Sequence, residues 1–207
     1  MLRKLLSFSK LYNIFSQIIA PTGATDFFFE HEPGIKVLDV GCGPGSRSHY
    51  FTDSRYLGID LSAKYIKTAN ERYEEYENIN FLQADVNTFF SEENEATEKF
   101  DLVILCGILH HLSDDEIENM LSRLGALLNS NGELRTFDGV YTDNQPRFAK
   151  YALKLDRGKH VRSISGYEKL IAKYFPNASY ALFDNLLRIP YTHIVFSCCE
   201  ADSGKSM

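Results

Sequence analysis

The chain has 207 residues, of which 44% are hydrophobic and 24% are charged, and these values exclude a disordered or fibrous protein. Its 22 basic and 28 acidic side chains give a formal net charge of −6, which argues against binding long nucleic acid mainly through phosphate neutralisation. The cysteines show neither a CxxC pair nor a zinc-type spacing, so we expect a reduced, cytoplasmic protein without a metal site. The length favours one domain over 1–207.

The first 30 residues predict a helical cap. Arg3 and Lys4 before apolar residues imitate a secretory signal, but polar residues interrupt the run and leave it too short for a signal or a membrane span. The apolar residues recur at steps of three and four, which is typical of an amphipathic helix that Pro21 would end. We expect this helix to dock on its own domain or on a neighbour's, so the oligomeric state stays open; membrane-surface binding is the alternative.

Beyond the cap, apolar strand-like runs alternate with helix-like runs. Two of the expected helices begin after the N-caps Ser62 and Ser113, and a later helix is expected over 166–175. Such alternation requires crossover connections and therefore a mainly parallel sheet with helices on both faces, a three-layer αβα sandwich. A short loop near the end favours an antiparallel last strand, and 201–207 is expected to be a loose tail. The seven expected strands are 35–40, 56–60, 80–84, 100–106, 133–138, 179–184 and 192–199.

The sharpest motif is VLDVGCGPG at 37–45, where a buried strand leads into a glycine-rich turn. Missing side chains let the backbone approach a ligand, and a helix that follows points its N–H groups at it. Nucleotide-binding oxidoreductases use a similar turn, but their glycines follow a different spacing. Asp39, two residues before the first glycine, would also repel a pyrophosphate, whereas it could hold an ammonium group.

This motif resembles the first motif of the class I S-adenosylmethionine-dependent methyltransferases, and the resemblance extends from about Tyr12 to the last strand. It implies a Rossmann-like fold with S-adenosyl-L-methionine as cofactor. The amino-acid end of the cofactor would lie at the glycine turn, the ribose at Asp60 and the adenine at Asp85. The implied cofactor-binding residues are Asp39, Gly41, Cys42, Gly43, Asp60, Leu61, Asp85, Val86 and Cys106.

Independently of the resemblance, three aspartates stand at or near the ends of successive expected strands. Open α/β sheets bind ligands at those carboxyl ends, and a carboxylate there can accept two hydroxyl donors. Each aspartate alone could be a helix cap or a turn residue, but their shared register with the glycine turn favours a common ligand. Cys42 is expected to be a small buried turn residue rather than a reactive thiol.

Residues for the methyl acceptor carry a weaker signal. The candidate catalytic residues are His110, His111 and Asp138, although histidines that pack on the cofactor and a turn aspartate are the plain alternatives. An acceptor-side insertion is expected at 139–165, and the stretch 145–173 holds eight basic and two acidic residues. This excess suggests an anionic acceptor, with a solvated helical face as the alternative. The candidate substrate-binding residues are Tyr141, Arg157, His160 and Arg162.

The leading hypothesis is therefore methyl transfer by in-line displacement to a small-molecule acceptor, with neither nucleic acid nor membrane as partner. The first alternative is a non-catalytic, S-adenosylmethionine-binding regulatory protein. The second is a nicotinamide-dependent oxidoreductase, which the glycine spacing and Asp39 disfavour.

Overall fold

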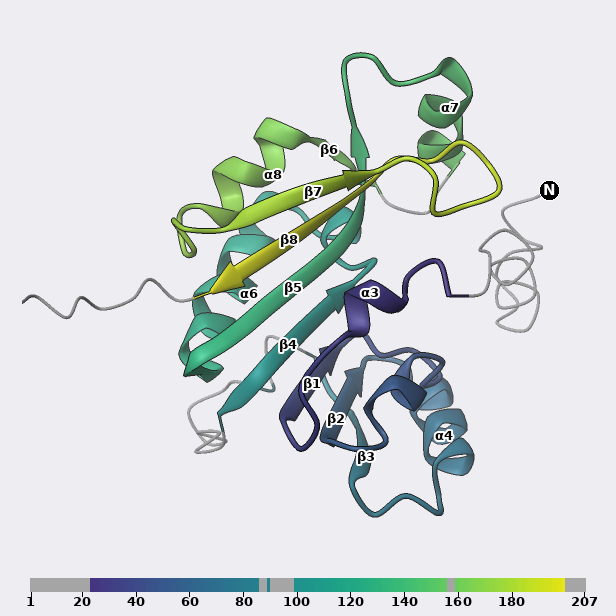
Figure 1. Ribbon diagram of the computed structural model, residues 1–207, viewed down its shortest axis with the longest axis vertical. Coiled ribbons are helices and arrows are strands. Elements are labelled where there is room, and N and C mark those ends of the chain that lie inside the picture. Colours follow the sequence, from purple (N-terminus) through teal and green to yellow (C-terminus); the bar gives the residue numbers. More distant parts are fainter. Residues whose placement is uncertain (1–22, 86–88, 90–98, 156–158, 200–207) are drawn as a thin grey trace, which may run out of the picture.

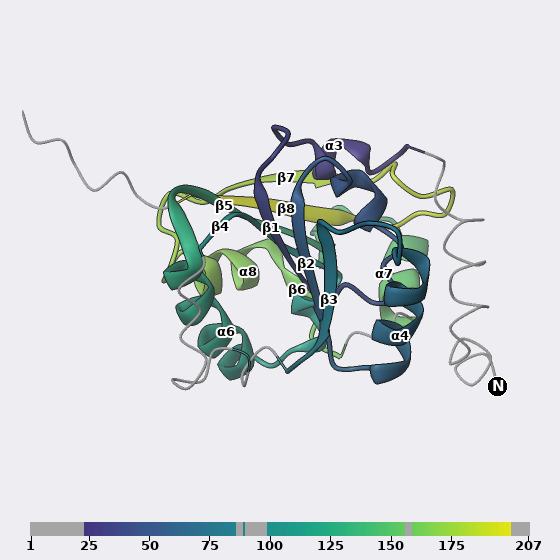
Figure 2. The same ribbon diagram turned by 90° about the horizontal axis from the view of Figure 1, so that it is seen from below.

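A parallel sheet forms the centre of the protein in the computed structural model, which describes residues 23–85, 89, 99–155 and 159–199 (Figures 1 and 2). Each parallel strand reaches the next through a crossover, as the alternation in the sequence predicted. The five parallel strands that build its core are β1 (Lys36–Val40), β2 (Arg55–Asp60), β3 (Ile79–Gln83), β4 (Phe100–Cys106) and β5 (Leu128–Tyr141).

The strand order is β3-β2-β1-β4-β5-β8-β7, and the short β6 (Arg162–Ser163) pairs with β5 beside this path. β8 (His193–Cys199) runs antiparallel to both β5 and β7 (Ser179–Phe183). The order reverses between β1 and β4, which is where open α/β sheets form a ligand crevice. The Rossmann-like layered fold, mostly parallel with an antiparallel last strand, is thus confirmed, while β6 adds an eighth strand that the sequence did not predict.

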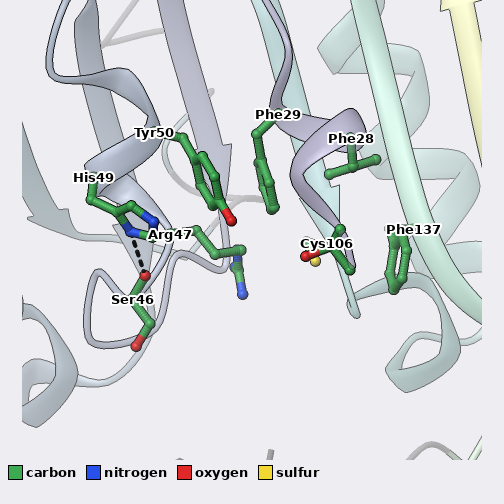
Figure 3. Close-up of a pocket in the computed structure, with 9 residues that line it drawn as sticks. Phe28, Phe29, Ser46, Arg47, His49, Tyr50, Cys106 and Phe137 are labelled. Carbon is green, nitrogen blue, oxygen red and sulfur yellow. Dashed lines mark hydrogen bonds between the residues drawn. The ribbon is translucent and has the colours of Figure 1, made fainter. Parts of the chain in front are cut away.

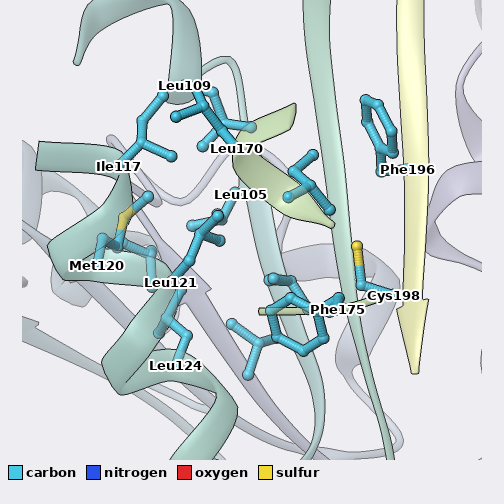
Figure 4. Packing of buried hydrophobic residues seen from close by; sticks show 14 of the residues in the cluster. Leu105, Leu109, Ile117, Met120, Leu121, Leu124, Leu170, Phe175, Phe196 and Cys198 are labelled. Atoms are coloured by element: carbon cyan, nitrogen blue, oxygen red, sulfur yellow. The ribbon is translucent and has the colours of Figure 1, made fainter. Parts of the chain in front are cut away.

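Helices cover the two faces of the sheet and create two hydrophobic cores. On one face, α6 (Asp114–Leu127) and α8 (Ile164–Ile171) pack against β4, β5 and β8 (Figure 4). On the other face lie α3 (Asp26–Phe29), the 3₁₀ turn η1 (Ser48–Phe51) and α4 (Ala63–Arg72). β4 alternates between the two, since Val103 joins the first core and Ile104 the second.

The predicted N-caps form. Ser62 accepts from the Tyr65 N–H at the start of α4, and Ser113 forms a capping box with Glu116 at the start of α6. Ser163 caps α8 in the same way, through the Gly166 N–H.

Some boundaries differ from the expectation. The helix expected up to Phe51 is one 3₁₀ turn, and the helix expected to reach Asn131 ends at Leu127. Leu128 instead pairs with Phe100 across β4 and β5 and is fully buried there. Because Leu128 would also be buried at the end of the expected helix, the spacing of apolar residues could not distinguish the helix from the strand at this position. The last helix ends at Ile171, although Phe175 beyond it is still buried. α7 (Arg147–Leu155) lies in the predicted 139–165 insertion.

The N-terminal cap predicted over 1–30 lies largely outside the described residues, as does the tail 201–207. The described end of the cap is the single turn α3, whose Phe28 and Phe29 are buried in the second core. Within the ranges given above, no helix combines the length and the apolar character needed to cross a bilayer.

The fold predicts opposite effects for two glycine-to-alanine changes. A Cβ at Gly58 in β2 would lie 2.8 Å from Cys42 Sγ and 2.8 Å from Phe81 Cδ1, so Gly58→Ala should lower the free energy of unfolding by about 1–3 kcal/mol. A Cβ at Gly125 in α6 would approach no atom closer than Phe175 Cζ at 3.8 Å, so Gly125→Ala should stabilise by about 0.5–1 kcal/mol. Urea unfolding of both variants measures these changes, and equal effects on the free energy of unfolding would contradict the tight packing of Cys42 and Phe81 around Gly58.

Candidate functional site

The glycine loop leaves β1 in a conformation that requires its glycines. Gly41 and Gly43 have φ angles of 72° and 59°, a region that side chains disfavour. A Cβ at Gly41 would stand 2.2 Å from Ile108 Cδ1, so the loop packs directly on the segment after β4. A Cβ at Gly43 would meet no atom within 4 Å, which leaves that backbone open to a ligand. The loop is tied to β2 because the Gly41 and Cys42 N–H groups donate to the Ile59 carbonyl at 2.8 and 3.0 Å.

Asp60 lies at the end of β2 and connects the glycine loop to α4. Its carboxylate accepts from the Gly43 N–H at 3.0 Å and from the Ser62 N–H at 2.8 Å. Beside it, Leu61 is 66% exposed. Asp85 follows β3 two residues after Gln83, which is the register partner of Asp60. The structure thus brings these predicted residues to one edge of the sheet, whereas Val86 lies outside the described residues.

Asp39 is completely buried, and its partners were not predicted. The Tyr56 hydroxyl donates to Asp39 Oδ2 at 2.7 Å, and Arg47 Nη2 lies 3.7 Å from Asp39 Oδ1. Burial raises the pKa of Asp39, while Arg47 and Tyr56 oppose the rise. Cys42 is 1% exposed and burial raises its pKa, as expected for a small turn residue that packs rather than reacts.

A cavity of about 180 Å³ opens beside the glycine loop, between α3 and the ends of β4 and β5 (Figure 3). Burial raises the pKa of Cys106 on its wall to about 11, so this thiol stays protonated at neutral pH. The sequence showed an apolar patch at 27–29 but gave no sign that it would wall a site, because the contact joins α3 to strands far along the chain. The lining residues are Thr25, Phe28, Phe29, Ser46, Arg47, His49, Tyr50, Cys106 and Phe137.

The candidate catalytic residues His110 and Asp138 form a buried pair. His110 Nδ1 lies 2.6 Å from Asp138 Oδ1, which also accepts the His110 backbone N–H at 3.1 Å. Burial raises the pKa of Asp138, and the hydrogen bonds from His110 oppose that rise. When Asp138 is ionised it only accepts, and this state places the proton of the neutral ring on Nδ1 and leaves Nε2 as the basic nitrogen. His111 is exposed, with its ring centroid 4.3 Å from that of His110.

The predicted substrate-binding residues do not all gather at this edge. Arg162 donates to the Leu109, Leu112 and His160 carbonyls at 2.7–3.0 Å and pairs with Asp114 at 2.6 Å. Its guanidinium therefore holds the segment that carries His110. His160 is exposed, and its backbone N–H donates to the His110 carbonyl at 3.0 Å. Tyr141 is half-buried at the end of β5, and Arg157 lies outside the described residues.

No group of three or more His, Cys, Asp or Glu residues is arranged to hold a metal ion in the described part of the chain.

The burial of Asp39 predicts a pH dependence of stability. Its folded pKa lies above its ordinary value of 3.8, so the folded state binds the proton more tightly than the unfolded state. The contribution of Asp39 to the free energy of unfolding should therefore fall as pH rises from the unfolded pKa to the folded one. Asn does not titrate, so the stability of the wild type minus that of Asp39→Asn should decline over this range. Urea unfolding of both proteins from about pH 4 to about pH 7 measures it, and a rising difference would contradict the prediction.

Comparisons with known proteins agree with this geometry. Residues 37–132 match the "Methyltransferase domain" family. A ubiquinone biosynthesis O-methyltransferase of Rhodopseudomonas palustris is 32% identical over 101 residues, which cover 48% of this chain and 38% of that protein. The chain spans less than two fifths of the length of the first curated relatives it matches.

Solved structures share the fold. The YcgJ protein of Bacillus subtilis is 13% identical with a TM-score of 0.66, covering 86% of this chain and 97% of that one. Human N-acetylserotonin methyltransferase, solved in complex with S-adenosylmethionine, is 17% identical with a TM-score of 0.66, covering 86% of this chain and 51% of that one. The part of the chain that carries the glycine loop and β4 is therefore similar to a methyltransferase domain, and the solved structures show that the fold is shared.

Proposed function

We propose that this chain transfers the methyl group of S-adenosylmethionine to a small-molecule acceptor. The observation that carries the proposal is the placement of the open Gly43 backbone, Asp60 and Asp85 at the carboxyl ends of three adjacent strands. The residues at this edge fit the cofactor, because carboxylates there can accept ribose hydroxyls and a bare backbone can lie against its chain. When bound, the cofactor supplies an activated methyl group on a sulfonium.

The contribution of the protein to such a reaction is mainly positioning. Holding two reactants in line can supply on the order of 7–11 kcal/mol of the barrier reduction. Asp60 is fixed for this task, since two backbone N–H groups hold its carboxylate and leave further lone pairs for hydroxyl donors. In the proposal, Asp85 lies beside the adenine and the Cys106 carbonyl accepts from the ammonium.

We propose that His110 acts as the base that takes up a proton from the acceptor. Asp138 holds the Nδ1 atom of His110, and the exposed His111 lies next to its ring. A buried carboxylate oriented on Nδ1 favours the tautomer that a base requires. Tyr141 is proposed to border the acceptor at the end of β5. An anionic acceptor remains our proposal for the basic insertion, supported by the exposed Lys159 and His160.

The central experiment tests methyl transfer itself. Purified protein with methyl-labelled S-adenosylmethionine and a small-metabolite extract should produce a labelled product and S-adenosylhomocysteine. Asp60→Asn should bind S-adenosylhomocysteine on the order of tenfold or more weakly, because it loses charged hydrogen bonds. Thermal stabilisation by S-adenosylhomocysteine but not by NADH is also expected. Binding without any labelled product would favour a regulatory protein, whereas stabilisation by NADH alone would favour an oxidoreductase.

The histidine pair gives a second prediction, on the acceptor found in this way. His110→Gln and Asp138→Asn should lower kcat on the order of 10²- to 10⁴-fold while leaving the affinity for S-adenosylhomocysteine close to that of the wild type. The wild-type rate should rise with pH as the imidazole loses its proton, and His110→Gln should lose this rise. His31→Gln, which removes a histidine paired with Asp53, is the control. An unchanged pH profile in His110→Gln would contradict a base at this position.

A further inference from the structure

Two buried polar atoms beside the glycine loop lack a hydrogen-bond partner among the described residues. They are Asp39 Oδ1, an acceptor, and Arg47 Nε, a donor. Buried polar atoms nearly always have a hydrogen-bond partner. A buried acceptor and a buried donor without partners, on two side chains that lie close together in space, therefore point to a ligand that offers both a donor and an acceptor.

The present partners of Arg47 are weak. Its Nη2 donates to the Gly41 carbonyl at 3.2 Å and stands 3.7 Å from Asp39 Oδ1, which is beyond hydrogen-bond length. Arg47 also lines the cavity beside Cys106, with 27% of its side chain exposed (Figure 3). The guanidinium thus stands against two acceptors, the Asp39 carboxylate and the Gly41 carbonyl, that an ammonium group could use beside the Cys106 carbonyl.

An α-amino acid zwitterion has the matching chemistry. Its ammonium can donate to Asp39 Oδ1 and the Gly41 carbonyl, and its carboxylate can accept the fork of a guanidinium through Nε and one terminal nitrogen. The two sets of contacts are coupled, because an ammonium group that binds to these two acceptors displaces Arg47 from them. The carboxylate attached to the same carbon then gives Arg47 a stronger partner than it had.

We propose that Arg47 exchanges partners when the cofactor binds. Before the cofactor binds, the guanidinium lies beside the Asp39 carboxylate and the Gly41 carbonyl. When the ammonium group binds to these two acceptors, the guanidinium binds the carboxylate of the cofactor's amino-acid end instead. This inference rests on the proposed cofactor site and adds a selection: the site favours a complete zwitterion over a lone amine, which Arg47 repels. No sequence pattern indicated this role, because Arg47 lies eight positions after Asp39, on the far side of the glycine turn.

Calorimetry with three nucleosides tests the exchange without any turnover. S-adenosylhomocysteine carries both groups, its decarboxylated analogue S-adenosyl-3-thiopropylamine carries the amine alone, and 5′-methylthioadenosine carries neither. Arg47→Gln should weaken S-adenosylhomocysteine on the order of 10- to 100-fold, as expected for a charged hydrogen-bonded pair. The same variant should bind the amine analogue as tightly as the wild type or several-fold more tightly, and methylthioadenosine within about twofold of the wild-type value.

Two further variants make the result specific. Arg72→Gln removes an exposed cation that donates to Ser46 Oγ at 3.3 Å beside the same loop, so it controls for long-range attraction and should change the three affinities little. Arg47→Lys keeps the charge without the fork and should fall between the wild type and Arg47→Gln for S-adenosylhomocysteine. Near-UV circular dichroism confirms folding, and Arg47→Lys carries the test if Arg47→Gln unfolds.

The outcomes separate the two proposals. If the wild type gives no heat with S-adenosylhomocysteine, the cofactor site fails and this inference falls with it. If the wild type binds and Arg47→Gln matches it for all three nucleosides, the inference alone is overturned. Equal weakening of all three would also overturn it, because Arg47 would then only support the loop.

Discussion

The contact between the glycine loop and the segment after β4 sets the geometry on which the site depends. Ile108 fills the space where a side chain at Gly41 would stand, and the loop is held to β2 through Ile59. Beneath the loop, Gly58 lets Cys42 and Phe81 meet across β2. Because three glycines with positive φ make this path possible, the backbone at Gly43 stays bare and faces outward instead of being buried under side chains.

Around that loop, charges are placed by burial and by fixed partners. Asp60 is held by two N–H groups, whereas Asp39 is held by a hydroxyl and a distant guanidinium. A carboxylate with both oxygens bound serves as a rigid acceptor, and one with an unmatched oxygen is prepared for a new donor. Asp39 and Asp60 therefore differ in their electrostatic environment, although both lie at or near the ends of parallel strands.

Sequence patterns predicted the parts of the fold that local chemistry decides. The strand ends at Asp60 and Cys106 and the caps at Ser62 and Ser113 follow from short-range periodicity and capping, and they form as predicted. Contacts between distant residues were beyond that reasoning. His110 and Asp138 are 28 residues apart, and Arg162 reaches Asp114 over 48 residues. A histidine, an aspartate and an arginine in loops give no periodic signal, so their partners appear only when the sheet brings the loops together.

Arg162 shows how such a long contact changes the interpretation of a residue. A basic stretch in the sequence suggested an anion clamp, but the guanidinium donates to three carbonyls and a carboxylate of its own protein. It ties β6 to the loop of His110, so the position of the proposed base depends on a residue that is remote in sequence. The role of Cys42, by contrast, followed from its place in a tight turn, where burial raises the pKa of the thiol and disfavours the reactive thiolate.

The proposed cofactor residues and most of the proposed acceptor residues lie in two different portions of the chain, with His110 and His111 as the exceptions. The family match ends at residue 132, and it contains the glycine loop, Asp60 and Asp85. Asp138, Tyr141 and Arg162 lie beyond it, on β5, β6 and their connections. Under the proposed function, selectivity for a new acceptor can therefore arise by remodelling the later strands and α7, while the proposed cofactor residues keep their geometry. Under this arrangement, the acceptor can change without a change in the strands that carry the proposed cofactor residues.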